Sequence, residues 1–209
     1  SLRRQRQMCI RDSRVVMQVL LAAAQANKHV SVYVTESRPT QQGLQTCRRL
    51  REAGVSCTVV LDAAVAYIMH KVDMCLIGAE GVAESGGLVN AVGTYQIGVV
   101  AKAANKPVFA VAESYKFLRL FPLSQYDIPI TTTVLPLPAE PDPASQAGER
   151  DAQAEAPANA PLRMTPEMEA LNPLIDYTLP ELVTFIVSDI GILTPSGVSD
   201  ALLAVYGGN

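Results

Sequence analysis

The chain has 209 residues, of which 49% are hydrophobic and 18% are charged, and its formal net charge at pH 7 is −3. This composition excludes a chain that is disordered throughout, because such chains lack apolar surface to bury, and the small negative charge argues against a dedicated nucleic-acid binder. No apolar run reaches the roughly 18 residues that a membrane-spanning helix needs. We therefore expect a soluble, cytoplasmic protein with no nucleic-acid and no membrane partner.

The first thirteen residues carry four arginines and little apolar pattern. We expect residues 1–13 to be a basic tail outside the domain, either non-native or truncated. The chain's four cysteines form no C-x-x-C pair, so we expect no metal site. Cys57 and Cys75 stand in apolar runs, which predicts small buried side chains.

Apolar periodicity predicts alternating helices and strands from residue 14 onward. Helices are expected at 14–27, 42–53, 63–70 and 94–105, and strands at 30–34, 57–61, 74–77 and 108–111, the first of them rich in β-branched residues. In the second helix Leu44, Cys47 and Leu50 are expected to face inward. Continuously apolar strands that alternate with helices indicate a parallel sheet covered on both faces. The predicted fold class is therefore α/β, a Rossmann-like doubly wound sheet over residues 14–130.

Residues 131–172 differ in kind from the rest of the chain. They hold seven of the fourteen prolines, and residues 138–161 contain no Val, Ile, Leu, Met, Phe or Tyr. Without apolar side chains nothing offsets the ordering entropy of roughly 1–2 kcal/mol per residue, so we predict a disordered, low-complexity Pro/Ala-rich insertion. The Rossmann-like domain is expected to resume over 173–209, with a buried run at 182–187 and a last helix that begins at Thr194-Pro195-Ser196.

Polar segments follow three predicted strands at their carboxyl ends, where open parallel sheets bind ligands. Arg38 follows the first strand, and a glycine-rich segment runs from the third strand to the helix at Thr94. A glycine-rich loop that ends at a helix start presents free N–H groups and a partial positive charge, which suits a phosphate. Glu36, Glu80 and Glu113 are expected to converge on one pocket. No standard phosphate-binding motif is present in this segment. The glycines could therefore serve only to form turns, and this alternative stays open.

Several blocks of the sequence match one known family. They are VYVTESRP at 32–39, VVLDAAVAYIM at 59–69, the glycine-rich segment 77–94, VAESYKF at 111–117 with LFPL at 120–123, DYT at 176–178 and GILTPS at 191–196. Together they resemble the carboxy-terminal domain of the family that contains the alpha, beta and delta subunits of initiation factor 2B and the methylthioribose-1-phosphate isomerases. The TESRP and AESYKF versions are most similar to the alpha branch.

The resemblance implies a regulatory subunit of translation initiation rather than an enzyme. It implies a Rossmann-like domain that forms a homodimer and assembles with the beta, gamma, delta and epsilon subunits of initiation factor 2B, the guanine-nucleotide exchange factor for initiation factor 2. It further implies a response to phosphorylated initiation factor 2, and no cofactor. The amino-terminal helical domain of the family is expected to lie almost wholly outside this chain.

The aldose–ketose isomerases of sugar 1-phosphates in the same superfamily are the alternative. Their Arg-Pro-x-x-Gln-Gly motif is matched from Arg38 to Gly43, but Glu80, Ala91 and Arg11 stand at the positions of a catalytic Asp, a Lys and a catalytic Cys. Isomerisation needs a positioned acid–base group, and a misplacement of about 1 Å can cost on the order of 100-fold. We therefore expect no catalytic and no metal residues. The expected sugar-phosphate-binding residues are Arg38, Gln42, Gly78, Glu80, Asn90, Gly93 and Thr94.

Overall fold

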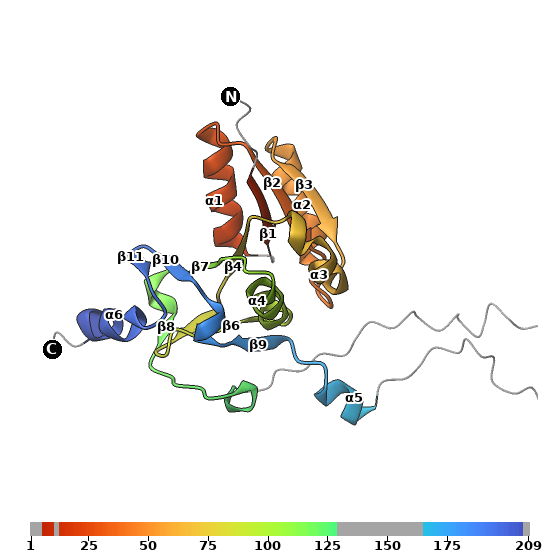
Figure 1. Cartoon of the computed structure of the whole chain (residues 1–209). Helices are drawn as coiled ribbons and strands as arrows, with labels where there is room; N and C mark the ends of the chain where they lie inside the picture. Colours follow the sequence, from red (N-terminus) through yellow and green to blue (C-terminus); the bar gives the residue numbers. More distant parts are fainter. Residues whose placement is uncertain (1–5, 11–12, 129–164, 207–209) are drawn as a thin grey trace, which may run out of the picture. The chain divides into compact units, whose positions relative to one another are not determined.

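A seven-stranded sheet runs through the larger of two compact units in the chain, residues 1–129 with 175–209 (Figure 1). The computed structural model describes residues 6–10, 13–128 and 165–206. The strand order is β11-β10-β7-β4-β1-β2-β3. Neighbouring strands are parallel except β10 and β11, which are antiparallel. The strands are β1 (Arg6–Ile10), β2 (Val30–Thr35), β3 (Ser56–Val60), β4 (Met74–Gly78), β7 (Val108–Val111), β10 (Phe185–Ser188) and β11 (Gly191–Leu193).

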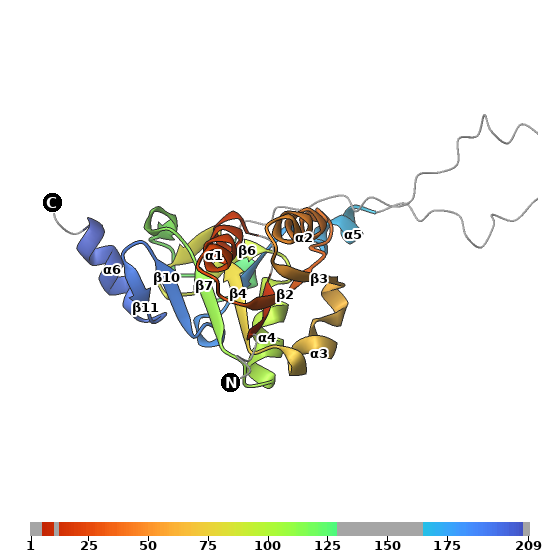
Figure 2. The same ribbon diagram turned by 90° about the horizontal axis from the view of Figure 1, so that it is seen from above.

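Helices cover both faces of this sheet, as the sequence predicted. Figure 2 shows α1 (Arg14–Gln25) and α2 (Gln42–Glu52) on one face and α3 (Val65–Ile68) and α4 (Thr94–Ala103) on the other. One apolar cluster joins Val16 and Leu20 of α1 to Val32 and Val34 of β2, and a second lies under α3 and α4 on the opposite face. The last helix, α6 (Gly197–Tyr206), begins after the predicted Thr-Pro-Ser start signal.

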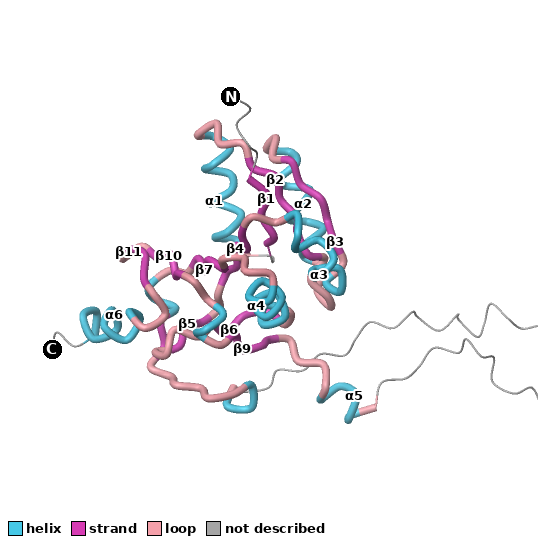
Figure 3. The backbone as a smooth tube through the Cα atoms, in the orientation of Figure 1, coloured by secondary structure: helices cyan, strands magenta, loops and turns pink. Residues whose placement is uncertain are grey.

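A second, four-stranded sheet was not foreseen from the sequence. Its order is β8-β5-β6-β9, with β8 (Phe117–Leu118), β5 (Gly81–Ala83), β6 (Leu88–Ala91) and β9 (Ile175–Thr178). Figure 3 shows β5, β6 and β9 side by side. The segment expected to be one glycine-rich loop therefore contains two strands, joined by a turn in which Gly86 adopts a left-handed φ of 84°.

Strand β1 corrects the expectation of a basic tail over residues 1–13. Arg6–Ile10 pair in parallel with β2 on one side and with β4 on the other. Cys9 and Ile10 are fully buried there, one facing each apolar cluster. Residues 6–10 therefore belong to the sheet, and periodicity missed them because the segment is short and half polar.

One predicted core residue of α2 is also corrected. Leu44 is 42% exposed, whereas Cys47 and Leu50 are buried as expected. The buried stripe of α2 consists of Gly43, Thr46, Cys47 and Leu50. Because Gly43 is the residue that packs against the sheet, its neighbour Leu44 is rotated towards solvent.

The predicted insertion falls mostly on residues 129–164, which lie outside the described residues. Its last part, from residue 165, is described and contains helix α5 (Pro166–Ala170), so this part is helical rather than disordered. No helix among the described residues is long and apolar enough to cross a membrane.

Candidate functional site

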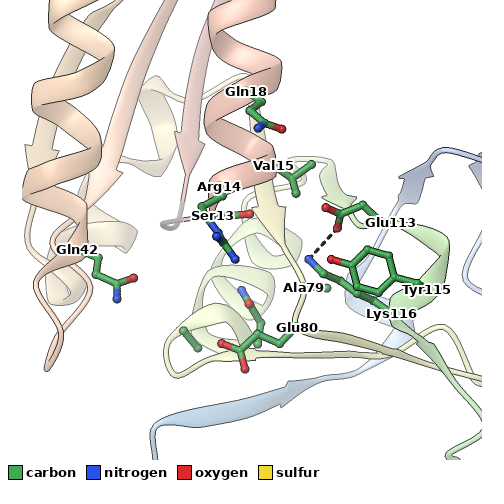
Figure 4. Close-up of a pocket in the computed structure, with 12 residues that line it drawn as sticks. Ser13, Arg14, Val15, Gln18, Gln42, Ala79, Glu80, Glu113, Tyr115 and Lys116 are labelled. Carbon is green, nitrogen blue, oxygen red and sulfur yellow. Dashed lines mark ion pairs between the residues drawn. The ribbon is translucent and has the colours of Figure 1, made fainter.

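A cavity of about 390 Å³ opens at the carboxyl end of the seven-stranded sheet, next to β1 and β4. The chain leaves β1 through α1 towards β2, and leaves β4 through α4 towards β7 on the other side, so the strand order reverses between them. Open α/β sheets bind ligands at this switch point, and the volume suits a small molecule. The residues lining the cavity are Ser13, Arg14, Val15, Gln18, Gln42, Ala79, Glu80, Asn90, Ala91, Glu113, Tyr115 and Lys116 (Figure 4).

Two basic side chains, Arg14 and Lys116, line the cavity from different walls. Figure 4 shows the Arg14 side chain pointing into the cavity and Lys116 on another wall. Ser13 precedes the first turn of α1 without a side-chain cap, and this turn contains no acidic residue. The partial positive charge of the helix N-terminus therefore adds to the Arg14 guanidinium. This part of the cavity suits an anion.

Two carboxylates also line the cavity, from Glu80 after β4 and Glu113 after β7. Lys116 Nζ lies 2.8 Å from Glu113 Oε2 and forms an ion pair with it. The hydrogen bond from Lys116 holds the pKa of Glu113 below its ordinary value. Glu113 therefore stays ionised at neutral pH and offers acceptors for a ligand's donors.

Hydrogen bonds to Asp189, in the turn between β10 and β11, fix the segment that carries Glu113, Tyr115 and Lys116. Asp189 Oδ1 accepts a hydrogen bond from the Ser114 backbone N–H at 2.6 Å, and Oδ2 accepts one from Ser114 Oγ at 2.7 Å. Ser188 Oγ donates a third at 2.8 Å. These bonds, those from Ser114 first, lower the pKa of Asp189 from 3.8 to about 2.

Replacing Ser114 with alanine is expected to raise the pKa of Asp189 towards 3.8, because the largest cause of the shift is removed. In the wild type this carboxylate stabilises the fold above the unfolded-state pKa, and the contribution is lost as the pH falls from about 4 to about 2. Titration of the Asp189 carboxyl carbon by NMR measures the midpoint. Ser124→Ala, which removes a hydroxyl near Asp127 instead, is the matched control. A midpoint that stays near 2 in Ser114→Ala contradicts the assignment.

The start of helix α4 is not open to a phosphate, contrary to expectation. Asp176 Oδ2 accepts hydrogen bonds from the N–H groups of Gly93 at 2.6 Å and Tyr95 at 3.0 Å. Thr94 is fully buried, and its hydroxyl is bonded to Ala91 and to Asn90. Gly93 and Thr94 therefore do not line the cavity; they lie behind the residues that do.

Arg38 also lies outside the cavity lining. Its side chain is 58% exposed, and its Nε lies 3.4 Å from Glu36 Oε2. The Asp62 carboxylate accepts the backbone N–H groups of Ser37 and Arg38, which fixes this loop. Of the three glutamates expected to converge, Glu80 and Glu113 line the cavity and Glu36 does not.

Gln42, Glu80 and Asn90 are the expected site residues that the structure brings together. Gly78 lies behind them, and a Cβ there would overlap the Ser13 side chain. The sequence did not predict a role for Arg14. Its place at the carboxyl end of the sheet follows only from strand β1, which was not predicted. Lys116 belongs to the polar segment after the fourth predicted strand, which was expected at the ligand-binding end of the sheet, although its own role was not predicted.

Metal ligands are not gathered in the described part of the chain. No group of three or more His, Cys, Asp or Glu residues there is placed to hold a metal ion. The four cysteines are free and buried. For Cys57 and Cys75 this confirms the expectation of small buried side chains.

The fold and cavity define a class: a doubly wound α/β domain with a polar cavity at the switch point of its sheet. Within this class the chain belongs to the Initiation factor 2 subunit family, which matches residues 5–195. The family expected from the sequence blocks is thereby confirmed.

Three similar proteins illustrate the range of this family. The chain is 41% identical over 194 residues to translation initiation factor eIF2B subunit alpha of Dictyostelium discoideum, covering 93% of this chain and 56% of that protein. It is 33% identical over 184 residues to ribose 1,5-bisphosphate isomerase of Archaeoglobus fulgidus, covering 88% and 52%. The solved translation initiation factor eIF-2B of Pyrococcus horikoshii OT3 has the same fold, with a TM-score of 0.71 and 22% identity over 91% of this chain and 58% of that one. The chain thus spans just over half the length of the relatives it matches.

Proposed function

We propose that this chain is the Rossmann-like part of a regulatory alpha subunit of initiation factor 2B and that it catalyses no reaction itself. The observation that carries the proposal is the 41% identity to an eIF2B alpha subunit across 93% of the chain, against 33% to an isomerase. The cavity agrees with this reading: Glu80 and Ala91, which depart from the isomerase pattern, both line it.

The proposed partners follow from the same relationship. They are a second copy of this chain, the beta, gamma, delta and epsilon subunits of initiation factor 2B, and initiation factor 2 in the cytoplasm. The similarity to eIF2B subunits supports membership of a multi-subunit complex. The phosphorylated form of initiation factor 2 is the proposed regulatory signal.

The cavity is proposed to bind a sugar phosphate as an effector. Arg14, Lys116 and the N-terminus of α1 offer positive charge for a phosphate. Glu80 and Asn90 line the same cavity and offer oxygen acceptors for sugar hydroxyls. Of the residues expected from the sequence, Gln42, Glu80 and Asn90 are the proposed contacts, whereas Arg38, Gly78, Gly93 and Thr94 hold the surrounding backbone.

Thermal unfolding with and without millimolar ribose 5-phosphate, combined with light scattering, tests both parts. We expect a dimeric mass and a raised unfolding midpoint, since a ligand at 100 times its dissociation constant stabilises the folded state by about 2.7 kcal/mol. A folded but strictly monomeric chain contradicts the subunit proposal. A dimer without a shift contradicts the effector proposal alone.

A sugar-phosphate isomerase remains the second candidate. The specific observation in its favour is that Gln42, Asn90 and the Glu80 carboxylate line one cavity in a chain that is 33% identical to ribose 1,5-bisphosphate isomerase. This candidate requires turnover of ribose 1,5-bisphosphate or methylthioribose 1-phosphate that Glu80→Gln abolishes. We expect no turnover at high protein concentration, and turnover sensitive to Glu80→Gln would replace the regulatory proposal.

A further inference from the structure

Helix α4 receives its N-terminal cap from a distant strand. The N-cap residue Gly93, at φ 98°, has no side chain, and the first turn contains no acidic residue. Asp176 on β9 supplies the missing acceptor, because its Oδ2 lies 2.6 Å from Gly93 N and 3.0 Å from Tyr95 N. A carboxylate that binds a helix N-terminus in this way satisfies otherwise unpaired donors and complements the helix dipole. The start of α4 is therefore fixed to β9.

The same strand pair places Asp176 beside a cavity residue. Strands β6 and β9 are antiparallel, and Asp176 is directly opposite Asn90 in their register. Asn90 lines the cavity, while Asp176 is 8% exposed and lies behind it. Asp176 therefore contacts no ligand directly, and any influence on binding passes through neighbouring groups.

The Thr94 hydroxyl connects the capped helix to the Asn90 amide. Thr94 Oγ1 donates its only hydrogen to Ala91 O at 2.7 Å, so it acts as an acceptor towards Asn90. Asn90 Nδ2 donates to this oxygen at 3.0 Å, and both side chains are at most 5% exposed. The bond sets the orientation of the amide: Nδ2 faces Thr94, and Oδ1 is left as its acceptor.

We propose that Asp176 is a positioning residue that acts through α4 and Thr94 to fix the Asn90 amide, so that Asn90 receives a hydroxyl donor of the ligand and not its anionic group. The inference deepens the proposed function, since it rests on the cavity binding a polyhydroxy anion. It assigns the ligand's hydroxyls to Asn90 and its anionic group to Arg14 and Lys116, all of which line the cavity. Displacing Asp176 or Thr94 then weakens recognition of the sugar and spares recognition of the phosphate.

The experiment compares two probes, ribose 5-phosphate and inorganic phosphate, by titration calorimetry on the full chain. Thr94→Val removes the hydroxyl at nearly constant volume, and Asp176→Ala removes the cap. Both are expected to weaken ribose 5-phosphate binding about tenfold, the value of a lost oriented hydrogen bond, and to change phosphate binding by less than about twofold. Asp127→Ala is the matched control: Asp127 also accepts two consecutive backbone N–H groups, from Leu123 and Ser124, and does not line the cavity.

An equal loss for both probes in Thr94→Val and Asp176→Ala overturns the inference, because it indicates general damage to the cavity. Unchanged binding of both probes overturns the inference as well.

A measurement without ligand separates the positioning role of Asp176 from the proposed function of the cavity. The side-chain amide protons of Asn90, observed by NMR, are expected to exchange faster with water in Asp176→Ala than in wild type. If they do not, the positioning role is wrong even where the wild type binds both probes. A wild type that binds neither probe overturns the effector proposal, while the amide readout still decides this inference.

Discussion

Replacing Gly43 with alanine is expected to lower the free energy of unfolding by about 3 kcal/mol, the upper end of the usual range for overpacking. A Cβ at this position would overlap the carbonyl oxygen of Thr35 and lie 2.9 Å from its carbon. Both are backbone atoms of β2, so no side-chain rotation can make room. Helix α2 must move away from the strand, and Gln42, the neighbouring residue at the cavity, moves with it.

The matched control is Gly54→Ala, at the other end of α2. Gly54 adopts a φ of 79°, but a Cβ there has nothing within 4 Å, so only the backbone conformation costs energy, about 1 kcal/mol. Urea unfolding at constant m-value measures both variants. Equal losses in the two variants would show that β2 and α2 do not pack as closely as described.

The seven-stranded sheet was predictable because its strands are apolar runs at regular spacing. The limits of β7 were predicted without error and those of β2 and β4 within one residue. The second sheet could not be recognised in the same way, since its strands have two to four residues and periodicity needs a longer window. Strand β1 escaped because its place in the sheet depends on pairing with β2 and β4, which no local pattern encodes.

The site was predictable where a residue directly follows a recognised strand. Glu80 and Glu113 follow β4 and β7, and both line the cavity. The sequence favoured a phosphate at the glycine-rich loop that ends at the helix start at Thr94, but Asp176, more than 80 residues away in sequence, binds the N–H groups of Gly93 and Tyr95 there. Free helix ends are visible in a sequence, whereas the distant side chain that occupies them is not.

Arg14→Ala is expected to weaken binding of ribose 5-phosphate by about 10- to 100-fold. Arg14 points into the cavity beside the uncapped N-terminus of α1 (Figure 4), and a hydrogen bond to a charged group contributes about 1.5–3 kcal/mol. Arg38→Ala, at the arginine that the sequence favoured, is expected to change this affinity by less than about twofold. Arg38 is exposed, pairs with Glu36 and does not line the cavity.

The comparison is informative because both arginines are exposed, so neither substitution should alter the free energy of unfolding by more than about 0.5 kcal/mol. Thermal unfolding of the ligand-free variants checks this, and titration calorimetry then gives the two affinities. A large loss of ribose 5-phosphate affinity in Arg38→Ala, with none in Arg14→Ala, would show that the phosphate binds at the loop after β2 instead. A loss in Arg14→Ala alone places the anion at the start of α1, where the order of the strands reverses.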